Sequence, residues 1–151
     1  MEPEGMVHAL DEVHRLTRPA GTLIEVHPAV EFPFVEVRSN EELLFSEHDP
    51  GYDYEDDLRD AEAAIATVVG RGVFVLEKSR RFEMRTHASS VKELRDHWAV
   101  YGAYDPVEKE ETLARRRDEM YARAHEVLER SPGAELVYVE PATMSRLTPA
   151  G

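Results

Sequence analysis

The most constraining feature of this sequence lies at residues 6–28, where a helical pattern, a tight break and a short apolar segment follow one another. Apolar side chains recur at three- and four-residue steps, which predicts one buried helical face made of Met6, Ala9, Leu10, Val13 and Leu16. Pro19 ends this helix, and Gly21 allows the backbone to turn. Thr22–His27 then carries apolar side chains on both faces, which is typical of an interior strand. We therefore predict an α/β fold organised around residues 6–28.

The rest of the chain alternates between strand and helix patterns. The predicted elements are a hairpin of Phe34–Arg38 and Leu43–Phe45, a helix ending at Gly70, a strand Phe82–His87, a helix ending at Gly102, a helix from Asp105 to about Arg130, and a strand Ala134–Glu140. Val73–Leu76 fits either the end of a helix or the start of a strand. Ala134–Glu140 is also apolar on both faces, so we expect it beside Thr22–His27 in a small mixed β-sheet with flanking helices. Phe82–His87 should lie outside this pair.

Composition narrows the class of protein. A chain of 151 residues has the length of one domain, with 42% apolar and 32% charged residues. It contains no cysteine, which excludes disulfides and thiolate chemistry. It has neither a membrane-spanning apolar run nor a signal-peptide pattern at its start, so we predict a cytoplasmic protein. A net charge of −13 argues against a nucleic-acid partner.

The segment EVHRLTRPAGTLI, residues 12–24, resembles the fourth helix and fifth strand of class I S-adenosylmethionine-dependent methyltransferases. It departs from them at Ala20, where the family usually has the first of two glycines. The order of the later elements matches the same family over nearly the whole chain. The resemblance implies the C-terminal half of a Rossmann-like fold: residues 1–28 as helix, turn and core strand, 29–60 as a substrate-side insertion, and 61–151 as helices and returning strands.

The family's cofactor site comes mostly from its other half, in a glycine-rich turn after the first strand and an acid that ends the second. No G-x-G follows a strand in this sequence. No cofactor-binding or catalytic residue can therefore be carried over from the resemblance. We expect the isolated chain to bind no cofactor, and S-adenosylmethionine only if a partner half completes the site.

The candidate ligand-side residues are Glu25, His27, His48 and Tyr52. Glu25 and His27 end the core strand at its carboxyl end, where open α/β sheets place their ligands. They could act as a substrate-side acid or base, or His27 could be an ordinary strand-end histidine. The acidic group of His48, Asp49, Asp53, Asp56 and Asp57 lacks EF-hand spacing, and an acidic helix start explains it, so we predict no metal site. Residues 115–117, all arginine, are expected on a solvated helical face.

Three functions remain open. The chain could be a methyltransferase-like half-domain that is not catalytic alone, either a relic or part of a split enzyme. It could be a small binding module that reuses residues 27–60, or a fragment of an active methyltransferase. We favour the half-domain. Its predicted partner is a second copy of the chain or a complementary methyltransferase half, because Thr22–His27 would otherwise present a free strand edge.

Overall fold

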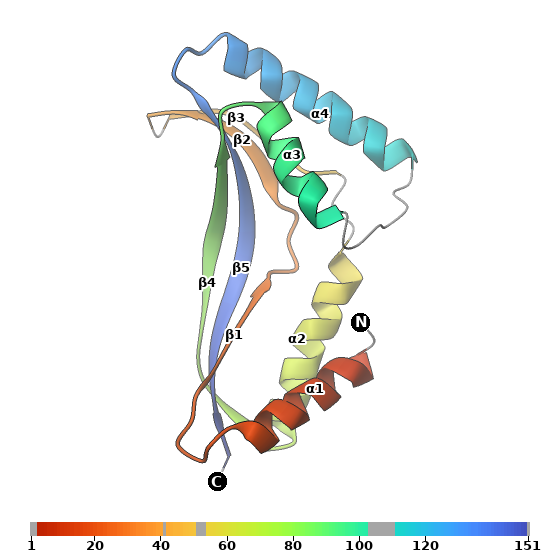
Figure 1. The fold of residues 1–151 in the computed structure, drawn as a ribbon, viewed down its shortest axis with the longest axis vertical. Helices are drawn as coiled ribbons and strands as arrows, with labels where there is room; N and C mark the ends of the chain where they lie inside the picture. The colour runs from red at the N-terminus through yellow and green to blue at the C-terminus, as the bar shows by residue number, and fades with distance from the viewer. Residues whose placement is uncertain (1–2, 41, 51–53, 103–110, 151) are drawn as a thin grey trace. The chain divides into compact units, whose positions relative to one another are not determined.

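A computed structural model describes residues 3–40, 42–50, 54–102 and 111–150 (Figure 1). The elements, in chain order, are α1 (Pro3–Leu16), β1 (Leu23–Pro28), β2 (Phe34–Ser39), β3 (Glu42–His48), α2 (Glu55–Gly70), β4 (Phe74–Ala88), α3 (Val91–Gly102), α4 (Glu111–Glu129) and β5 (Glu135–Pro149). The fold is α/β, as predicted. The predicted helix start at Asp105 lies outside the described residues, as does Asp53 of the acidic group.

The chain divides into two compact units. Unit 1 comprises Met1–Glu31, Asp53–Glu83 and Pro141–Gly151, and unit 2 comprises Phe32–Tyr52 and Met84–Glu140. The two longest strands, β4 and β5, each contribute residues to both units. The expectation that the chain forms a single domain stays a prediction.

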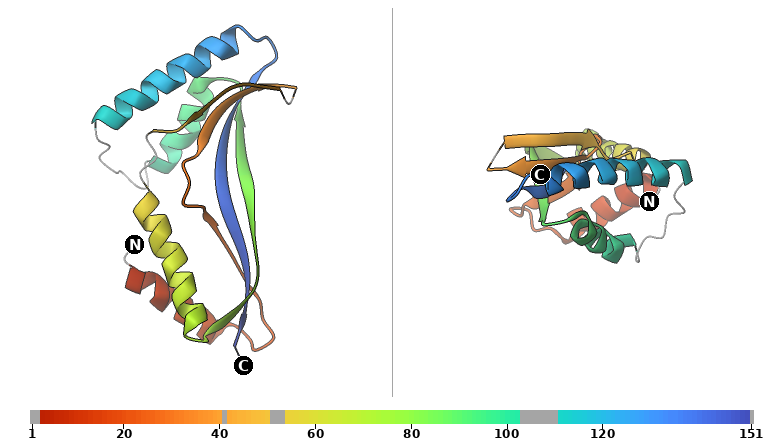
Figure 2. Two further views of the ribbon diagram at one scale, coloured as in Figure 1. Left: turned by 180° about the vertical axis from the view of Figure 1, so that it is seen from behind. Right: turned by 90° about the horizontal axis from the view of Figure 1, so that it is seen from above.

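The five strands form an antiparallel sheet, so the predicted mixed sheet is wrong. In unit 1, β1 pairs with the later part of β5, from Leu23 opposite Leu147 to Pro28 opposite Ala142. In unit 2, β2 pairs with the earlier part of β5, and β3 pairs with the other edge of β2. Strand β4 pairs with β5 on the side away from β1, as the two ribbon views show (Figure 2). Among the described strands, only β2–β3 and β4–β5 are neighbours both in the chain and in the sheet, whereas β1 and β2 both pair with β5 and not with each other.

The two predicted interior strands are neighbours, but through a different part of β5 than expected. The prediction ended this strand at Glu140, whereas β5 continues through Pro141 to Pro149. Pro141 has no N–H to donate, yet its carbonyl oxygen accepts a hydrogen bond from the Ala29 N–H at 2.8 Å. The residues that face β1 are therefore 142–147, and residues 135–139 face β2.

Strand β4 is also longer than predicted. The ambiguous segment Val73–Leu76 begins it, and the strand runs without interruption to Ala88. The predicted hairpin is present as β2 and β3, and Asn40, which follows β2, takes a positive φ of 47°. β2 extends the sheet by pairing with β5.

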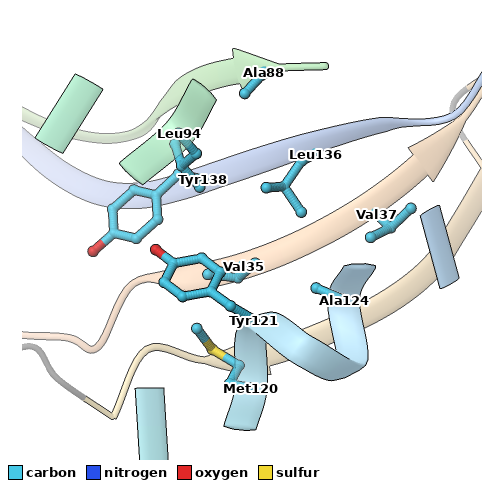
Figure 3. Packing of buried hydrophobic residues seen from close by; sticks show 9 residues of the cluster. All are labelled: Val35, Val37, Ala88, Leu94, Met120, Tyr121, Ala124, Leu136 and Tyr138. Atoms are coloured by element: carbon cyan, nitrogen blue, oxygen red, sulfur yellow. The ribbon is translucent and has the colours of Figure 1, made fainter. Parts of the chain in front are cut away.

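Each unit has its own apolar core. In unit 1, Val68, Phe74 and Leu147 are fully buried, and α1 contributes Val7, Leu10 and Val13 to the same cluster. In unit 2, α3 and α4 pack against β2 and β5 (Figure 3). That cluster contains Val35, Val37, Ala88, Leu94, Met120, Tyr121, Ala124, Leu136 and Tyr138. The helical stripe predicted for α1 is confirmed only in part, because Leu10 and Val13 join the core of unit 1 whereas Ala9 and Leu16 are exposed.

Candidate functional site

The structure brings two of the predicted site residues together at the end of β1. Glu25 and His27 are two positions apart in the strand, so their side chains share one face of the sheet. Leu23, on that same face, belongs to the core under the helices of unit 1. The His27 Nδ1 atom lies 2.6 Å from Glu25 Oε1, and the two side chains are only 11% and 17% exposed. This distance defines a partly buried histidine–carboxylate pair.

A second carboxylate approaches the opposite side of the ring. Glu62 of α2 places its Oε1 atom 4.0 Å from His27 Nε2, and its side chain is half exposed. His27 Nε2 and Glu25 Oε2 are both buried, and neither has a hydrogen-bond partner among the residues that the structure describes. Buried polar atoms without partners are uncommon in folded proteins and cost stability. The pair is therefore a candidate site, because packing alone does not account for these two atoms.

The geometry determines where the histidine proton lies. An ionised carboxylate can only accept a hydrogen bond, so the short contact to Glu25 places the proton of neutral His27 on Nδ1. The lone pair then remains on Nε2, which faces Glu62. A histidine held in this tautomer by a carboxylate can accept a proton at Nε2, as in hydrolase triads. The arrangement is suited to general acid–base chemistry.

The other two candidates do not join this pair. His48 belongs to unit 2, where it ends β3 opposite Phe34. Its ring stacks on the Phe34 ring at 4.1 Å between centroids and meets Phe32 edge-on at 6.2 Å. His48 is therefore an aromatic packing residue at the end of the hairpin. Tyr52 lies outside the described residues.

Unit 2 contains a buried charged cluster that sequence reasoning missed. Asp49 is completely buried and accepts hydrogen bonds from Arg117 Nη2 at 2.6 Å and from the Tyr138 hydroxyl at 3.2 Å. The Asp49 N–H donates to the Pro33 carbonyl at 2.8 Å, which fixes the backbone that carries the carboxylate. Arg117 was predicted on a solvated face, but its side chain is only 21% exposed, whereas Arg115 and Arg116 are exposed. The prediction for Arg117 is therefore wrong.

Asp49 was one of the acidic residues considered above as a metal ligand, and in the structure its partner is an arginine. The Asp49 carboxylate neutralises Arg117. Asp56 and Asp57 lie in the first turn of α2, where the helix dipole favours acidic side chains. Among the described residues, no three histidine or acidic side chains are grouped so that they could hold a metal ion. The signal that could have found the cluster is periodicity, because Arg117 is three and four residues before the buried Met120 and Tyr121.

Burial and charge fix the protonation states of the cluster. Burial raises the pKa of Tyr138 far above its usual range, and the nearby Asp49 charge raises it further. Burial likewise raises the pKa of Tyr121. Burial alone would lower the pKa of Arg117, but Asp49 and the two tyrosines outweigh it and raise that pKa. At neutral pH the cluster therefore holds one charged arginine and two neutral tyrosines.

Comparison of the chain with protein-family models, with curated proteins and with solved structures found no match. None of the described helices is both long enough and apolar enough to cross a membrane.

Proposed function

We propose that this chain is the substrate-side half of a class I S-adenosylmethionine-dependent methyltransferase, with His27 as a proton acceptor oriented by Glu25. In this proposal the residues that bind the cofactor lie outside these 151 residues, in a partner chain or elsewhere in a longer protein. The motif-like segment at residues 12–24 supports it, since this segment forms the end of α1, the turn and the start of β1.

The observation that carries the proposal is the order of strands around β5. In the family, the seventh strand returns between the fifth and the sixth. Here β5 pairs with β1 on one side and with β4 on the other. The resemblance equates β1 with the fifth strand, residues 82–87 of β4 with the sixth and residues 134–140 of β5 with the seventh. Residues 135–139 pair with β2 and residues 142–147 pair with β1, so the match holds for β5 as a whole strand and not for the predicted segment. The helix pair α1 and α2 contributes to the core against the same sheet, which is also the arrangement that the resemblance implies.

The histidine–carboxylate pair supplies the chemistry that such a half would need. Transfer of a methyl group to a hydroxyl or amine leaves a proton that a base must remove. His27 Nε2 carries the lone pair for this role, and Glu25 stabilises the imidazolium that forms. Glu62 lies on the Nε2 side, so the new N–H would face a carboxylate.

The direct test is a calorimetric titration of the purified chain with S-adenosylmethionine and S-adenosylhomocysteine. We expect no binding, because the chain offers no glycine-rich turn to receive the methionine part of the cofactor. Micromolar binding of either compound by the chain alone would overturn the view that the cofactor residues lie elsewhere.

The role of His27 is tested by ¹⁵N NMR of histidine-labelled protein. We expect the neutral ring to carry its proton on Nδ1, and the Glu25→Gln variant to lose this fixed tautomer. His48, whose ring stacks on Phe34, serves as an internal control in the same spectrum. A proton found on Nε2 of neutral His27 would rule out the proposed proton acceptor.

The same proposal gives β1 a partner. Among the described strands β1 pairs only with β5, so its other edge has free N–H and C=O groups. Ile24 and Val26 on its outer face are 54% and 47% exposed. Such an edge favours pairing with another strand, and a two-fold homodimer closes on itself. A complementary methyltransferase half is the other partner that would fit.

Sedimentation of the purified chain tests the homodimer. We expect a dimer at micromolar concentration that the Val26→Lys variant disrupts, with Met144→Lys on the neighbouring strand as the control away from the edge. A monomer whose edge-facing β1 amides are nevertheless protected from hydrogen exchange would contradict pairing through this edge. A monomer with unprotected amides would favour the complementary half.

A further inference from the structure

Unit 2 contains an open pocket of about 300 Å³ between α3 and α4. Its walls come from Arg95, Trp98, Ala99, Ala114, Arg117, Asp118 and Tyr121. We propose that this pocket binds a small aromatic carboxylate. The inference is independent of the proposed function, because Glu25 and His27 belong to unit 1.

The apolar part of the pocket is suited to a flat ring. Trp98 and Tyr121 present aromatic rings from the two helices, and Trp98 is held in place by the Tyr138 ring at 4.9 Å between centroids. Ala99 and Ala114 leave space where larger side chains would fill it. Ligand sites are typically lined by apolar and aromatic groups with a few fixed polar groups, and begin at about 300 Å³. A volume at this lower end fits a ligand of a single ring.

The polar part of the pocket contains two arginines, and each is paired with an acid: Arg95 with Asp118, and Arg117 with Asp49. The Arg95 and Arg117 guanidinium carbons lie 4.9 and 5.9 Å from the centre of the Tyr121 ring. Arg117 is anchored by its Nη2 contact to Asp49, while its Nε is buried and has no hydrogen-bond acceptor within the described part of the chain. The Nε atom is closed to solvent, so a ligand oxygen would contact the part of the Arg117 side chain that stays exposed, which is 21% of its surface. A carboxylate supplies such an oxygen.

Arg95 offers a second contact at the rim. It pairs with Asp118 at 2.6 Å, but both side chains are about half exposed or more, at 47% and 66%. Exposed ion pairs contribute little, so Arg95 can turn to an incoming anion at small cost. A polyanion is disfavoured, because the chain carries a net charge of −13 that would repel it outside the pocket. These charges select a ligand with one carboxylate.

The chain provides its own probe for this site. Trp98 is the only tryptophan, so its fluorescence reports on the pocket alone. We expect titration with benzoate to produce a saturable change in this fluorescence, with a Kd on the order of a millimolar or below, as is typical of a ligand of this size. Benzyl alcohol has the same ring without the charge, and we expect it to bind about tenfold more weakly.

Two variants locate the binding. Ala114→Phe fills the pocket and should abolish the benzoate signal, whereas Ala66→Phe on the exposed face of α2 in unit 1 should leave it unchanged. Arg117→Met should remove the preference for benzoate over benzyl alcohol. If Ala114→Phe fails to fold by circular dichroism, Ala99→Leu tests the same pocket from α3. The proposal is overturned if benzoate gives no saturable change, if benzyl alcohol binds equally well, or if a folded pocket-filling variant still responds.

Discussion

Replacing Asp49 by asparagine removes the charge at the centre of the buried cluster in unit 2. The carboxylate is fully buried, and it neutralises Arg117 and accepts the Tyr138 hydroxyl. Asparagine has nearly the same shape and can still accept a hydrogen bond, so little packing is lost. The substitution therefore isolates the cost of leaving the Arg117 charge without its partner.

The size of the effect follows from the burial of the two partners. Removing one member of a buried ion pair typically costs about 3–5 kcal/mol. The Arg117 side chain retains 21% exposure, so water can recover part of its solvation, and the amide oxygen keeps a hydrogen bond. We expect Asp49→Asn to lower the free energy of unfolding by about 2–3 kcal/mol, a large part of a typical total stability of about 5–15 kcal/mol.

Urea unfolding followed by Trp98 fluorescence measures this free energy in the unit that contains the cluster. The control is Glu47→Gln, which breaks the solvent-exposed contact to Arg123 at 2.6 Å and should cost less than about 1 kcal/mol. In Arg117→Met, the Asp49 carboxylate loses its partner instead. The double variant, Asp49→Asn with Arg117→Met, should lose less free energy of unfolding than the sum of the losses in the two single variants. Equal effects of Asp49→Asn and Glu47→Gln would refute the reasoning, because burial would then make no difference.

Three further substitutions test other parts of the fold. Burial raises the pKa of Glu140, so its charged form destabilises the folded state, and stability falls as pH rises from the unfolded to the folded pKa. Glu140→Gln should raise the thermal midpoint at pH 7 and have little effect below about pH 4, where the acid is protonated in both states. Gly133 has a φ of 83°, so Gly133→Ala should lower the free energy of unfolding by about 1 kcal/mol. Its control is Gly70→Ala at the end of α2, where an added Cβ meets nothing within 4 Å, and which should be neutral or stabilising in the same thermal melts. Phe74 is 1% exposed, and Phe74→Ala should cost about 3–5 kcal/mol in urea unfolding followed by far-UV circular dichroism; a cost below about 1 kcal/mol would contradict its place in the core of unit 1.

Local periodicity was enough to predict most elements of this chain. The helix α1 and the strand β1 follow from apolar spacing and from Pro19 and Gly21, which act over a few residues. The length of β4 could not be predicted in the same way, because all of its side chains from Val75 to Glu83 are exposed and give no apolar alternation. Strand direction was also missed, since it depends on pairing between residues far apart in the chain.

In the candidate site, too, local features could be predicted from the sequence and long-range contacts could not. Glu25 and His27 could be predicted together, because a spacing of two on one strand places both side chains on one face. Glu62 could not, since it approaches from a helix later in the chain. Asp49 and Arg117 are 68 residues apart, and each resembles a surface residue in its own surroundings. Only the tertiary fold reveals that they bury one another's charge.

The two outer strands of unit 1 differ in how they would behave in a crowded, concentrated solution. β4 is long and largely exposed, but it carries Lys78, Arg80 and Arg81 close together. Cationic side chains on an edge discourage the growth of aggregates by strand addition. β1 has the sequence LIEVHP, with a single acid and a closing proline. Misassembly during expression should therefore begin at β1, and a lysine placed there should improve the yield of soluble protein more than one placed on β4.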